Sequence, residues 1–313
     1  MIAYAVRRLA YGFLVVLGVL GLLFALFFVY AQPVDMARRA VGEKASPEVL
    51  ALWIHQHGYD RPKLEQLRDH YRKMLTFDFG RSDLDDVPIA RRLREGAGPS
   101  LSFTVPAFAI GLLLAIQLSL FVAYFRETYI DRTILLVAVL EMSVSILLYI
   151  IGGQYVIGKI LCWFPISGFA PDPALIPRFI AMPVLIYALA GVGGDVRFYR
   201  TVFVEETNRD YVRTARAKGA GDVRVMVRHV LRNSLIPILT NVVMAIPFLF
   251  MGALLIESFF GIPGLGAVTV DAVQANDFST LRVMVYITAL LFTVFQVVTD
   301  FTYTLADPRV RLE

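Results

Sequence analysis

The chain has 313 residues, of which 57% are hydrophobic and only 18% are charged, and its mean hydropathy is +0.64. Soluble domains carry about 25% charged residues, so this composition indicates a membrane protein. The net charge of +4 comes largely from one loop, and no basic–aromatic patch lies outside it, which argues against nucleic-acid binding. The single cysteine, Cys162, excludes an intrachain disulfide and a cysteine-based zinc site.

Six apolar segments are long enough to cross a hydrocarbon core of roughly 30 Å. They are expected within residues 9–30, 96–125, 132–159, 176–194, 232–257 and 282–305. The first segment follows Arg7 and Arg8 and is too long for a cleaved signal peptide, so we expect a retained span. The expected fold class is all-α, a polytopic membrane protein with six transmembrane helices.

Lysine and arginine are concentrated in the short loops of one side. That side holds two at the N-terminus, two in 126–132, nine in 195–235 and two in the C-terminal tail, against two in 159–178 and none in 258–280. By the positive-inside rule, both termini are expected to be cytoplasmic. The long segment 32–95 then falls outside the membrane.

Residues 32–95 are expected to form a small extracytoplasmic helical segment between the first and second spans. Ser46-Pro47-Glu48 is typical of a helix start, with Ser46 as the cap, and Gly58 is expected to end this helix. A second helix is predicted after Pro62. Its apolar face is expected to contain Leu64, Leu67, Tyr71 and Leu75.

The basic loop at 195–235 is the long polar interval in the second half of the chain. A helix is expected to stop at Gly219, because glycine suits the end of a helix and the turn that follows. A second helix is expected to restart with Asp222 as its N-cap and to run to Asn233, before Pro237 enters the next span.

The run 210–219, Asp-Tyr-Val-Arg-Thr-Ala-Arg-Ala-Lys-Gly, resembles the cytoplasmic EAA loop of ABC-transporter permeases, in the branch that imports peptides and nickel. Arg213-Thr214-Ala215 stand at the Glu-Ala-Ala positions of that pattern, of which only the last alanine and Gly219 are kept. Three further segments are similar to motifs of the same family, so that the resemblance covers nearly the whole chain: Cys162–Gly168, Glu257–Gly266 and Asp300–Arg311.

This resemblance implies that 1–313 is one ABC-importer transmembrane domain and one of two permease subunits. With a similar partner it would form the path for peptides or related small solutes across the cytoplasmic (inner) membrane of a prokaryote. The other implied partners are an extracytoplasmic substrate-binding protein, two cytoplasmic ATPase subunits or domains, and membrane lipid. We expect no enzyme activity and no cofactor in this chain, which lacks a phosphate-binding Gly-x-x-x-x-Gly-Lys-Ser/Thr loop; ATP would be bound by the partner subunits.

The resemblance also implies that 205–224 couples the permease to its ATPase. The residues expected to take part are Tyr211, Arg213, Thr214, Ala215, Arg216, Ala217, Lys218, Gly219 and Asp222. Ala215 is expected to be small because it lies against the ATPase. No metal site is expected anywhere in the chain.

Glu141 is a lone carboxylate in the third predicted span, where charge is costly and usually functional. It would face the substrate path, together with Gln117, or it would be satisfied by Ser143, Gln117 or another subunit. Both alternatives stay open. In the second span, Ala107, Gly111 and Ala115 repeat every four residues, either as a helix-packing stripe or by chance.

Two other functions are compatible with a polytopic membrane protein. An ion-gradient-driven secondary transporter would need several intramembrane acids and an internal repeat. The two candidate acids, Glu141 and Asp300, are too few, and no repeat is evident. A non-transporting membrane scaffold would have no use for the basic helix–glycine–helix loop. Co-purification of an ATPase would separate the permease from both.

Overall fold

The computed structural model describes the backbone of residues 2–170, 172 and 174–306, and the side chains of 6–170, 172 and 174–300. Helices dominate this part of the chain, and the β-structure found in it is one isolated bridge between Arg81 and Pro88. The first half contains α1 (Ile2–Phe24), the π-helix η1 (Ala25–Tyr30), α2 (Pro33–Val41), α3 (Pro47–Gln56), α4 (Lys63–Leu75), α5 (Ile89–Tyr124), α6 (Tyr129–Ser143), α7 (Ile146–Gly153) and η2 (Gln154–Ile160). The second half contains α8 (Ile176–Thr207), α9 (Asp210–Ala217), α10 (Asp222–Val225), η3 (Met226–Val230), α11 (Leu231–Asn233), α12 (Leu235–Met251), α13 (Leu254–Phe260), α14 (Leu265–Gln274) and α15 (Phe278–Ala306).

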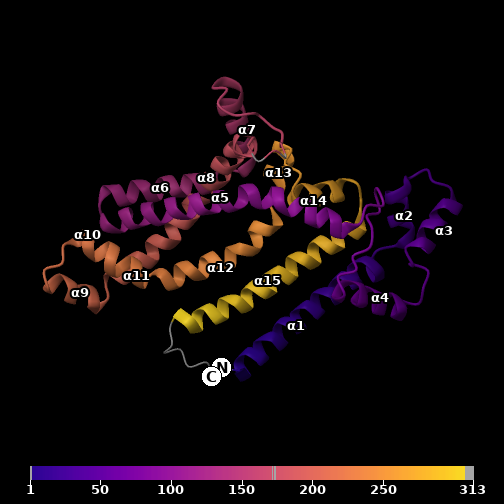
Figure 1. The fold of residues 1–313 in the computed structure, drawn as a ribbon, viewed down its shortest axis with the longest axis horizontal. Coiled ribbons are helices and arrows are strands. Elements are labelled where there is room, and N and C mark those ends of the chain that lie inside the picture. Colours follow the sequence, from indigo (N-terminus) through magenta and orange to yellow (C-terminus); the bar gives the residue numbers. More distant parts are fainter. Residues whose placement is uncertain (1, 171, 173, 307–313) are drawn as a thin grey trace.

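The long helices form a bundle (Figure 1), in which α5 and α8 make the most extensive contact. The stripe of Ala107, Gly111 and Ala115 is buried, and a Cβ at Gly111 would lie 3.3 Å from the carbonyl oxygen of Ala188 in α8. The stripe therefore serves close helix packing, as one of the two alternatives predicted. Around this pair, α6 packs on α8, α12 on α5, α15 on α12 and α1 on α15.

The structure contains four straight helices that are long and apolar enough to span a membrane, and up to seven spans if each of three bent helix pairs counts as one, within the described residues. The chain is therefore a polytopic all-α protein. Four of the six predicted segments overlap one of the four single helices, and the segments 132–159 and 232–257 each overlap one of the bent pairs. The exact six-span topology stays a prediction, because α13 and α14, bent by 86°, form a further apolar hairpin that begins at the end of the predicted fifth span and continues into the predicted outer loop.

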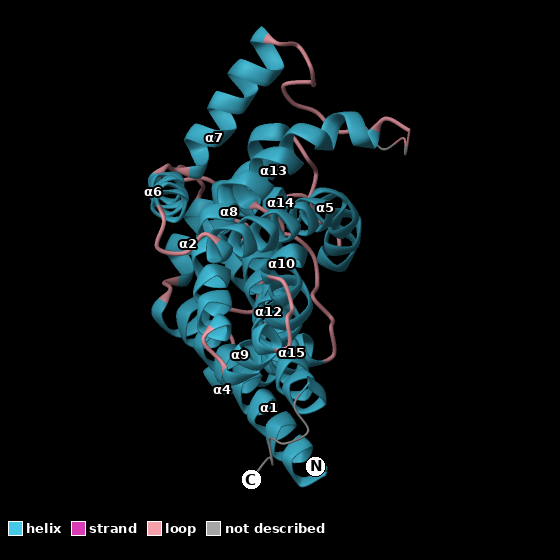
Figure 2. Cartoon of the chain, turned by 90° about the vertical axis from the view of Figure 1, so that its left-hand side faces the viewer, coloured by secondary structure: helices cyan, strands magenta, loops and turns pink. Residues whose placement is uncertain are grey.

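The third predicted span is not a straight helix. α6 ends at Ser143, and α7 with η2 turns away by 89°, so that α7 projects from the bundle (Figure 2). Val144 is extended at the break, and Ser145 caps the new helix by accepting a hydrogen bond from the backbone N–H of Leu147 at 3.4 Å. A serine cap and one extended residue thus produce this bend without a proline.

The helices of the predicted extracytoplasmic segment agree with the sequence in their limits but only partly in the buried face of α4. Ser46 caps α3 as predicted, and α4 begins directly after Pro62. However, Leu64 is 78% exposed, whereas Gln66 and His70 are buried. The amide of Gln66 donates to the carbonyls of Tyr59 and Arg61, at 3.0 and 2.8 Å. The predicted apolar face was therefore only half right: Leu67 and Tyr71 pack inward, whereas Leu64 and Leu75 are exposed and polar side chains with interior partners take their place.

His70 is as deeply buried as Gln66, each being 4% exposed. Its Nε2 lies 3.2 Å from the carbonyl oxygen of Leu20 in α1. Burial and the nearby charge of Arg282 lower the pKa of His70 to about 4, so the ring is neutral at ordinary pH. A neutral ring can donate to the Leu20 carbonyl without placing a charge between α4 and α1.

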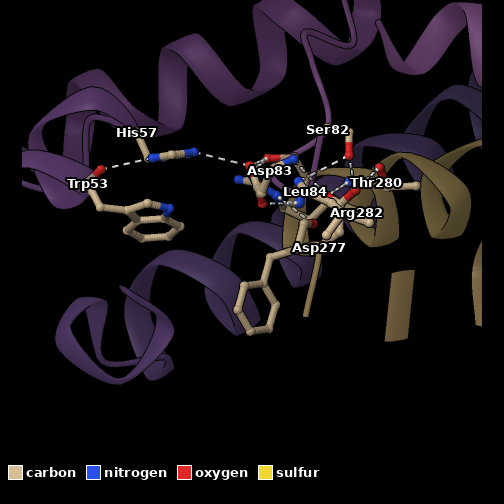
Figure 3. A network of polar contacts seen from close by, with 10 residues as sticks. Trp53, His57, Ser82, Asp83, Leu84, Asp277, Thr280 and Arg282 are labelled. Atoms are coloured by element: carbon tan, nitrogen blue, oxygen red, sulfur yellow. Dashed lines mark hydrogen bonds and ion pairs between the residues drawn. The ribbon is translucent and has the colours of Figure 1, made fainter. Parts of the chain in front are cut away.

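A polar network ties this outer segment to the start of α15 (Figure 3). Asp277 accepts hydrogen bonds from the hydroxyls of Ser82, at 2.5 Å, and Thr280, at 2.6 Å. Asp83 accepts from the Ser279 hydroxyl at 2.7 Å and lies 3.1 Å from His57 Nε2. The Ser82–Asp277 and Asp83–Ser279 contacts join residues almost 200 positions apart and fix this end of the bundle.

The same network favours the charged form of His57. Burial alone would lower its pKa, but the Asp83 carboxylate, with which it is hydrogen-bonded, and the Trp53 carbonyl, 2.8 Å from Nδ1, raise the pKa above its usual value. Burial likewise opposes ionisation of Asp83, but its hydrogen bonds to His57 and Ser279 hold the pKa of that carboxyl below its usual value.

Candidate coupling site and transmembrane cavity

The predicted cytoplasmic loop begins inside a helix. α8 continues through Thr207, so residues 195–207 belong to this helix. The helix has Asn208 as its C-cap, and α9 starts at Asp210. The Arg126 guanidinium, in the turn after α5, donates to the Thr207 hydroxyl at 3.1 Å and to the Asn208 side-chain oxygen at 2.9 Å. The direction of α9 is therefore set from both α5 and α8.

The predicted helix–glycine–helix turn is confirmed. α9 ends at Ala217, Gly219 has a φ of +82°, and α10 starts at Asp222. A Cβ at position 219 would meet no atom within 4 Å, so the backbone conformation alone requires glycine here. The prediction that Asp222 is the N-cap was wrong, because Gly221 occupies that position; the Asp222 carboxylate instead accepts from Arg216 Nε across the turn, at 3.1 Å.

Ala215 faces the interior of the chain. It is 8% exposed and belongs to a buried cluster with Val212 and Val225 of the same helical turn and Phe203 of α8. The backbone N–H of Ala220 donates to the Ala215 carbonyl at 3.1 Å as the chain turns back. The expectation that Ala215 is small because it lies against an ATPase is corrected: its size lets α9 and α10 pack together.

Tyr211 links α9 to the end of α8. Its hydroxyl donates to the Glu206 carboxylate at 2.5 Å. Burial and this hydrogen bond to an anion raise the pKa of Tyr211 to about 12, so the phenol stays protonated and keeps its donor. Among the predicted coupling residues, Tyr211 and Ala215 therefore hold the turn in place through contacts inside the chain.

The other predicted coupling residues lie on the outer side of the turn. All seven are exposed: Arg213, Thr214, Arg216, Ala217, Lys218, Gly219 and Asp222. The sequence reasoning missed two neighbours, Val223 at 66% and Val227 at 53% exposure. They are four residues apart on one face of the stretch 222–233. The sequence does indicate this exposure through its valines at 223, 225 and 227, because a helix that buries Val225 must expose the other two.

We call this outer side the coupling surface, made of the seven exposed residues above with Val223 and Val227. It combines two exposed valines with Arg213, Arg216 and Lys218, and exposed apolar and arginine side chains are common in protein–protein contacts. The surface is also tied to the membrane part of the bundle. After Asn233 the chain passes through Ser234, which is fully buried, and bends by 52° into α12. A displacement of α9 and α10 therefore acts on α8 at one end and on α12 at the other.

Glu141 lies in the interface between α6 and α8. A Cβ at Gly193 would overlap its carboxylate, so glycine is needed there. Both carboxylate oxygens are buried without a hydrogen-bond partner among the described residues. Ser143 donates to the Val139 carbonyl instead, and Gln117 is exposed on α5. The structure thus does not bring Glu141 and Gln117 together, and the remaining alternatives for Glu141 are the substrate path and another subunit.

A separate cavity of about 390 Å³ lies between α5, α8 and α12. Its described lining is mostly small or apolar, with Tyr187, Asp195 and Asn241 as the residues with larger polar groups. Neither Glu141 nor Gln117 belongs to this lining.

The run Glu257–Gly266, one of the segments that resembles a family motif, folds around its own glutamate. The Glu257 side chain is fully buried and accepts from the Ser100 hydroxyl at 2.7 Å and from the backbone N–H groups of Ala253 and Ala267, at 3.2 and 2.9 Å. A Cβ would collide with this carboxylate at each of three glycines, Gly252, Gly264 and Gly266. The spacing of the motif is therefore that of a carboxylate-centred hairpin joining α13 and α14 to α5.

Comparison with known proteins agrees with these features. Residues 100–312 match the family described as binding-protein-dependent transport system inner membrane component, and residues 1–84 match the N-terminal family of such components. A putative peptide transport system permease protein of Brucella abortus (strain 2308) is 32% identical over 316 residues, across the whole of both chains. The glutathione transport system permease protein GsiC of Salmonella choleraesuis is 30% identical over 311 residues, 99% of each chain. The protein is thus a transport permease and not an enzyme, and it belongs to the family of binding-protein-dependent transport system inner membrane components.

Proposed function

We propose that the chain is one of two permease subunits of an ATP-driven importer for peptides or related small solutes in the cytoplasmic membrane of a prokaryote. The peptide and glutathione systems of its relatives support this cargo class. An extracytoplasmic binding protein would deliver the cargo, and two ATPase subunits or domains would bind ATP. The ion-driven and scaffold alternatives find no support in relatives that are named as transport-system permeases.

The arrangement of the helices supports the predicted orientation. The coupling surface on α9 and α10 and the outer helices α2–α4 lie at opposite ends of the molecule (Figure 1). An ion pair between Arg8 and Asp300 joins the start of α1 to the end of α15. In a Cys162→Ser background, cysteine at Asp69 should react with an impermeant thiol reagent from outside, and cysteine at Asp222 should not. The reverse pattern would overturn the orientation.

The observation that carries the proposed coupling is the division of the turn into two sides. Val212, Ala215 and Val225 face inward and make the turn one body with α8, while Val223 and Val227 are exposed on a surface rich in arginine. When ATP closes the ATPase dimer, the turn would move as a unit and carry α8 and α12 with it. This is rigid-body coupling driven by a partner chain.

Val223→Asp tests this assignment. Burying a whole valine side chain contributes about 1.5 kcal/mol, so burial of this one should contribute about 1 kcal/mol before any charge effect. Val223→Asp should therefore reduce the ATPase retained on the purified permease at least about fivefold, without lowering the permease level in the membrane. Val49→Asp, at a valine 45% exposed in the outer helix α3, is the matched control and should retain the ATPase. Normal retention in Val223→Asp would contradict the proposal.

A further inference from the structure

The cavity between α5, α8 and α12 is partly open, because Phe248 in its lining is 52% exposed. Asp195 is twelve residues before Thr207, where α8 ends next to the coupling surface, and Gly111 is thirteen residues before the end of α5 at Tyr124. At 1.5 Å per residue these separations correspond to roughly 18 and 20 Å. Because α5 and α8 are both long and apolar enough to cross a hydrocarbon core of roughly 30 Å, the cavity lies between candidate membrane-spanning helices.

Asp195 enters this cavity without a counter-charge. The lining residues include no lysine, arginine or histidine within the part of the chain that the structure describes. The two arginines that follow in α8 are engaged elsewhere: Arg200 makes two hydrogen bonds to Asp131, at 2.7 and 2.6 Å, and Arg197 faces the sulfur of Met142. A carboxylate in such surroundings is costly unless a cation reaches it.

The neutral side chains of Asn241 and Tyr199 lie beside Asp195 but do not compensate its charge. The Asn241 amide of α12 donates to the Tyr199 hydroxyl of α8 at 2.8 Å, and the same side chain interacts with Asp195. Asp195 and Asn241 thus stand on the two helices that flank the coupling turn. A movement of α9 and α10 relative to the bundle would change the spacing of this pair.

The lining suits an organic cation better than a metal ion. Divalent metals need several oxygen, nitrogen or sulfur ligands, and no group of three His, Cys, Asp or Glu side chains that could hold one occurs among the described residues. A peptide instead carries one ammonium group, on its N-terminus, attached to a chain that apolar walls can accommodate. A volume of about 390 Å³ is within the range of small-molecule pockets, about 300–1,000 Å³.

We propose that Asp195 forms the subsite that receives the positively charged amino group of the transported peptide inside the membrane, with Asn241 as its positioning residue. This inference rests on the proposed peptide-import function. It assigns cargo recognition to the α8–α12 contact, which the coupling turn can move, and not to Glu141 or Gln117.

The first test is independent of cargo. In a Cys162→Ser background, cysteine is placed at Ala245, which lines the cavity, and its reaction rates with cationic and anionic methanethiosulfonate reagents are compared in the assembled importer. The cationic reagent should react at least about tenfold faster, the ratio that 1.4 kcal/mol produces, and Asp195→Asn should remove most of that preference. Asp35→Asn, at an exposed acid of α2, is the control and should leave it intact. Equal rates in the parent, or a preference that survives Asp195→Asn, would overturn the subsite; cysteine at Ala190 repeats the test if the Ala245 variant is not assembled.

The second test uses cargo. ATP-driven uptake of trialanine and of N-acetyl-trialanine is measured in vesicles that contain the whole importer and its binding protein. Wild type should prefer the free amine, and Asp195→Asn should lower trialanine uptake about tenfold while changing the acetylated peptide less than about twofold. An equal loss for both peptides would assign Asp195 a structural role and overturn the inference. If wild type takes up neither peptide although charge-selective labelling persists, the peptide assignment fails and the cation subsite alone stands.

Discussion

Gly219→Val should uncouple the permease from its ATPase while leaving the permease folded. The φ of +82° at this position is one that a β-branched residue rarely adopts, and holding it there costs about 1–3 kcal/mol. Because a Cβ at 219 would meet open space within the chain, the whole cost lies in the backbone of the turn. The turn would relax away from its docked shape, and a penalty of this size weakens binding roughly 5- to 150-fold.

The assay is the amount of ATPase that co-purifies with the tagged permease, together with stimulated ATP hydrolysis and the thermal midpoint of the permease alone. Gly219→Asn is the matched variant, because asparagine tolerates positive φ far better than valine. It should retain the ATPase within about threefold of wild type. Full retention of the ATPase by Gly219→Val would refute the argument. Equal losses of the ATPase in both variants would show that the volume of the side chain against the partner weakens binding, and not the backbone conformation.

Three further predictions concern the interior of the protein. Ala215→Arg should lower the permease level and its thermal midpoint, by more than about 2 kcal/mol of unfolding free energy, because it forces a charge into a packed cluster; Ala217→Arg, two residues on and exposed, should be normal in the same expression and melting assays. Folding raises the pKa of His57 above its ordinary value of 6.5, so the stability that His57 contributes is fully present below pH 6.5 and is lost as the pH rises through the pKa of the folded protein. The thermal midpoint, measured between pH 5.5 and 8.5, should show this decline, and His57→Gln should flatten it. Gly193→Ala should destabilise the α6–α8 contact by about 1–3 kcal/mol, and the added Glu141→Ala change should recover most of that loss if the overlap with the carboxylate is the cause.

The sequence predicted those features that depend on local chemistry. Apolar runs located the helices of the spans, and Gly219 marked a turn that requires positive φ. It could not predict features set by contacts between distant residues. Ala215 looked like a surface residue because its neighbours are charged, but burial against Val225 explains its size. The face of α4 was partly misjudged because Gln66 is satisfied by backbone carbonyls that periodicity does not register.

The candidate sites also include one that local sequence predicted and one that depends on contacts between distant residues. Seven of the nine predicted coupling residues are exposed on one turn, since the motif that indicated them is contiguous in the chain. The cavity was missed because Asp195 and Asn241 are 46 positions apart and meet only when α8 packs near α12. From the sequence, Asp195 was taken as the start of a cytoplasmic loop, whereas α8 continues for twelve residues beyond it.

The central claim is that the outer side of the α9–α10 turn docks an ATPase. Single cysteines in a Cys162→Ser background, with a short thiol-reactive cross-linker applied to the assembled importer, test it directly. Cysteine at Val223 or Ala217 should form a cross-link to the ATPase, and the yield should change when ATP is added. Cysteine at Leu64, equally accessible but on the outer helix α4, should form none. A cross-link from Leu64, or none from either position of the turn in a complex that still hydrolyses ATP, would contradict the claim.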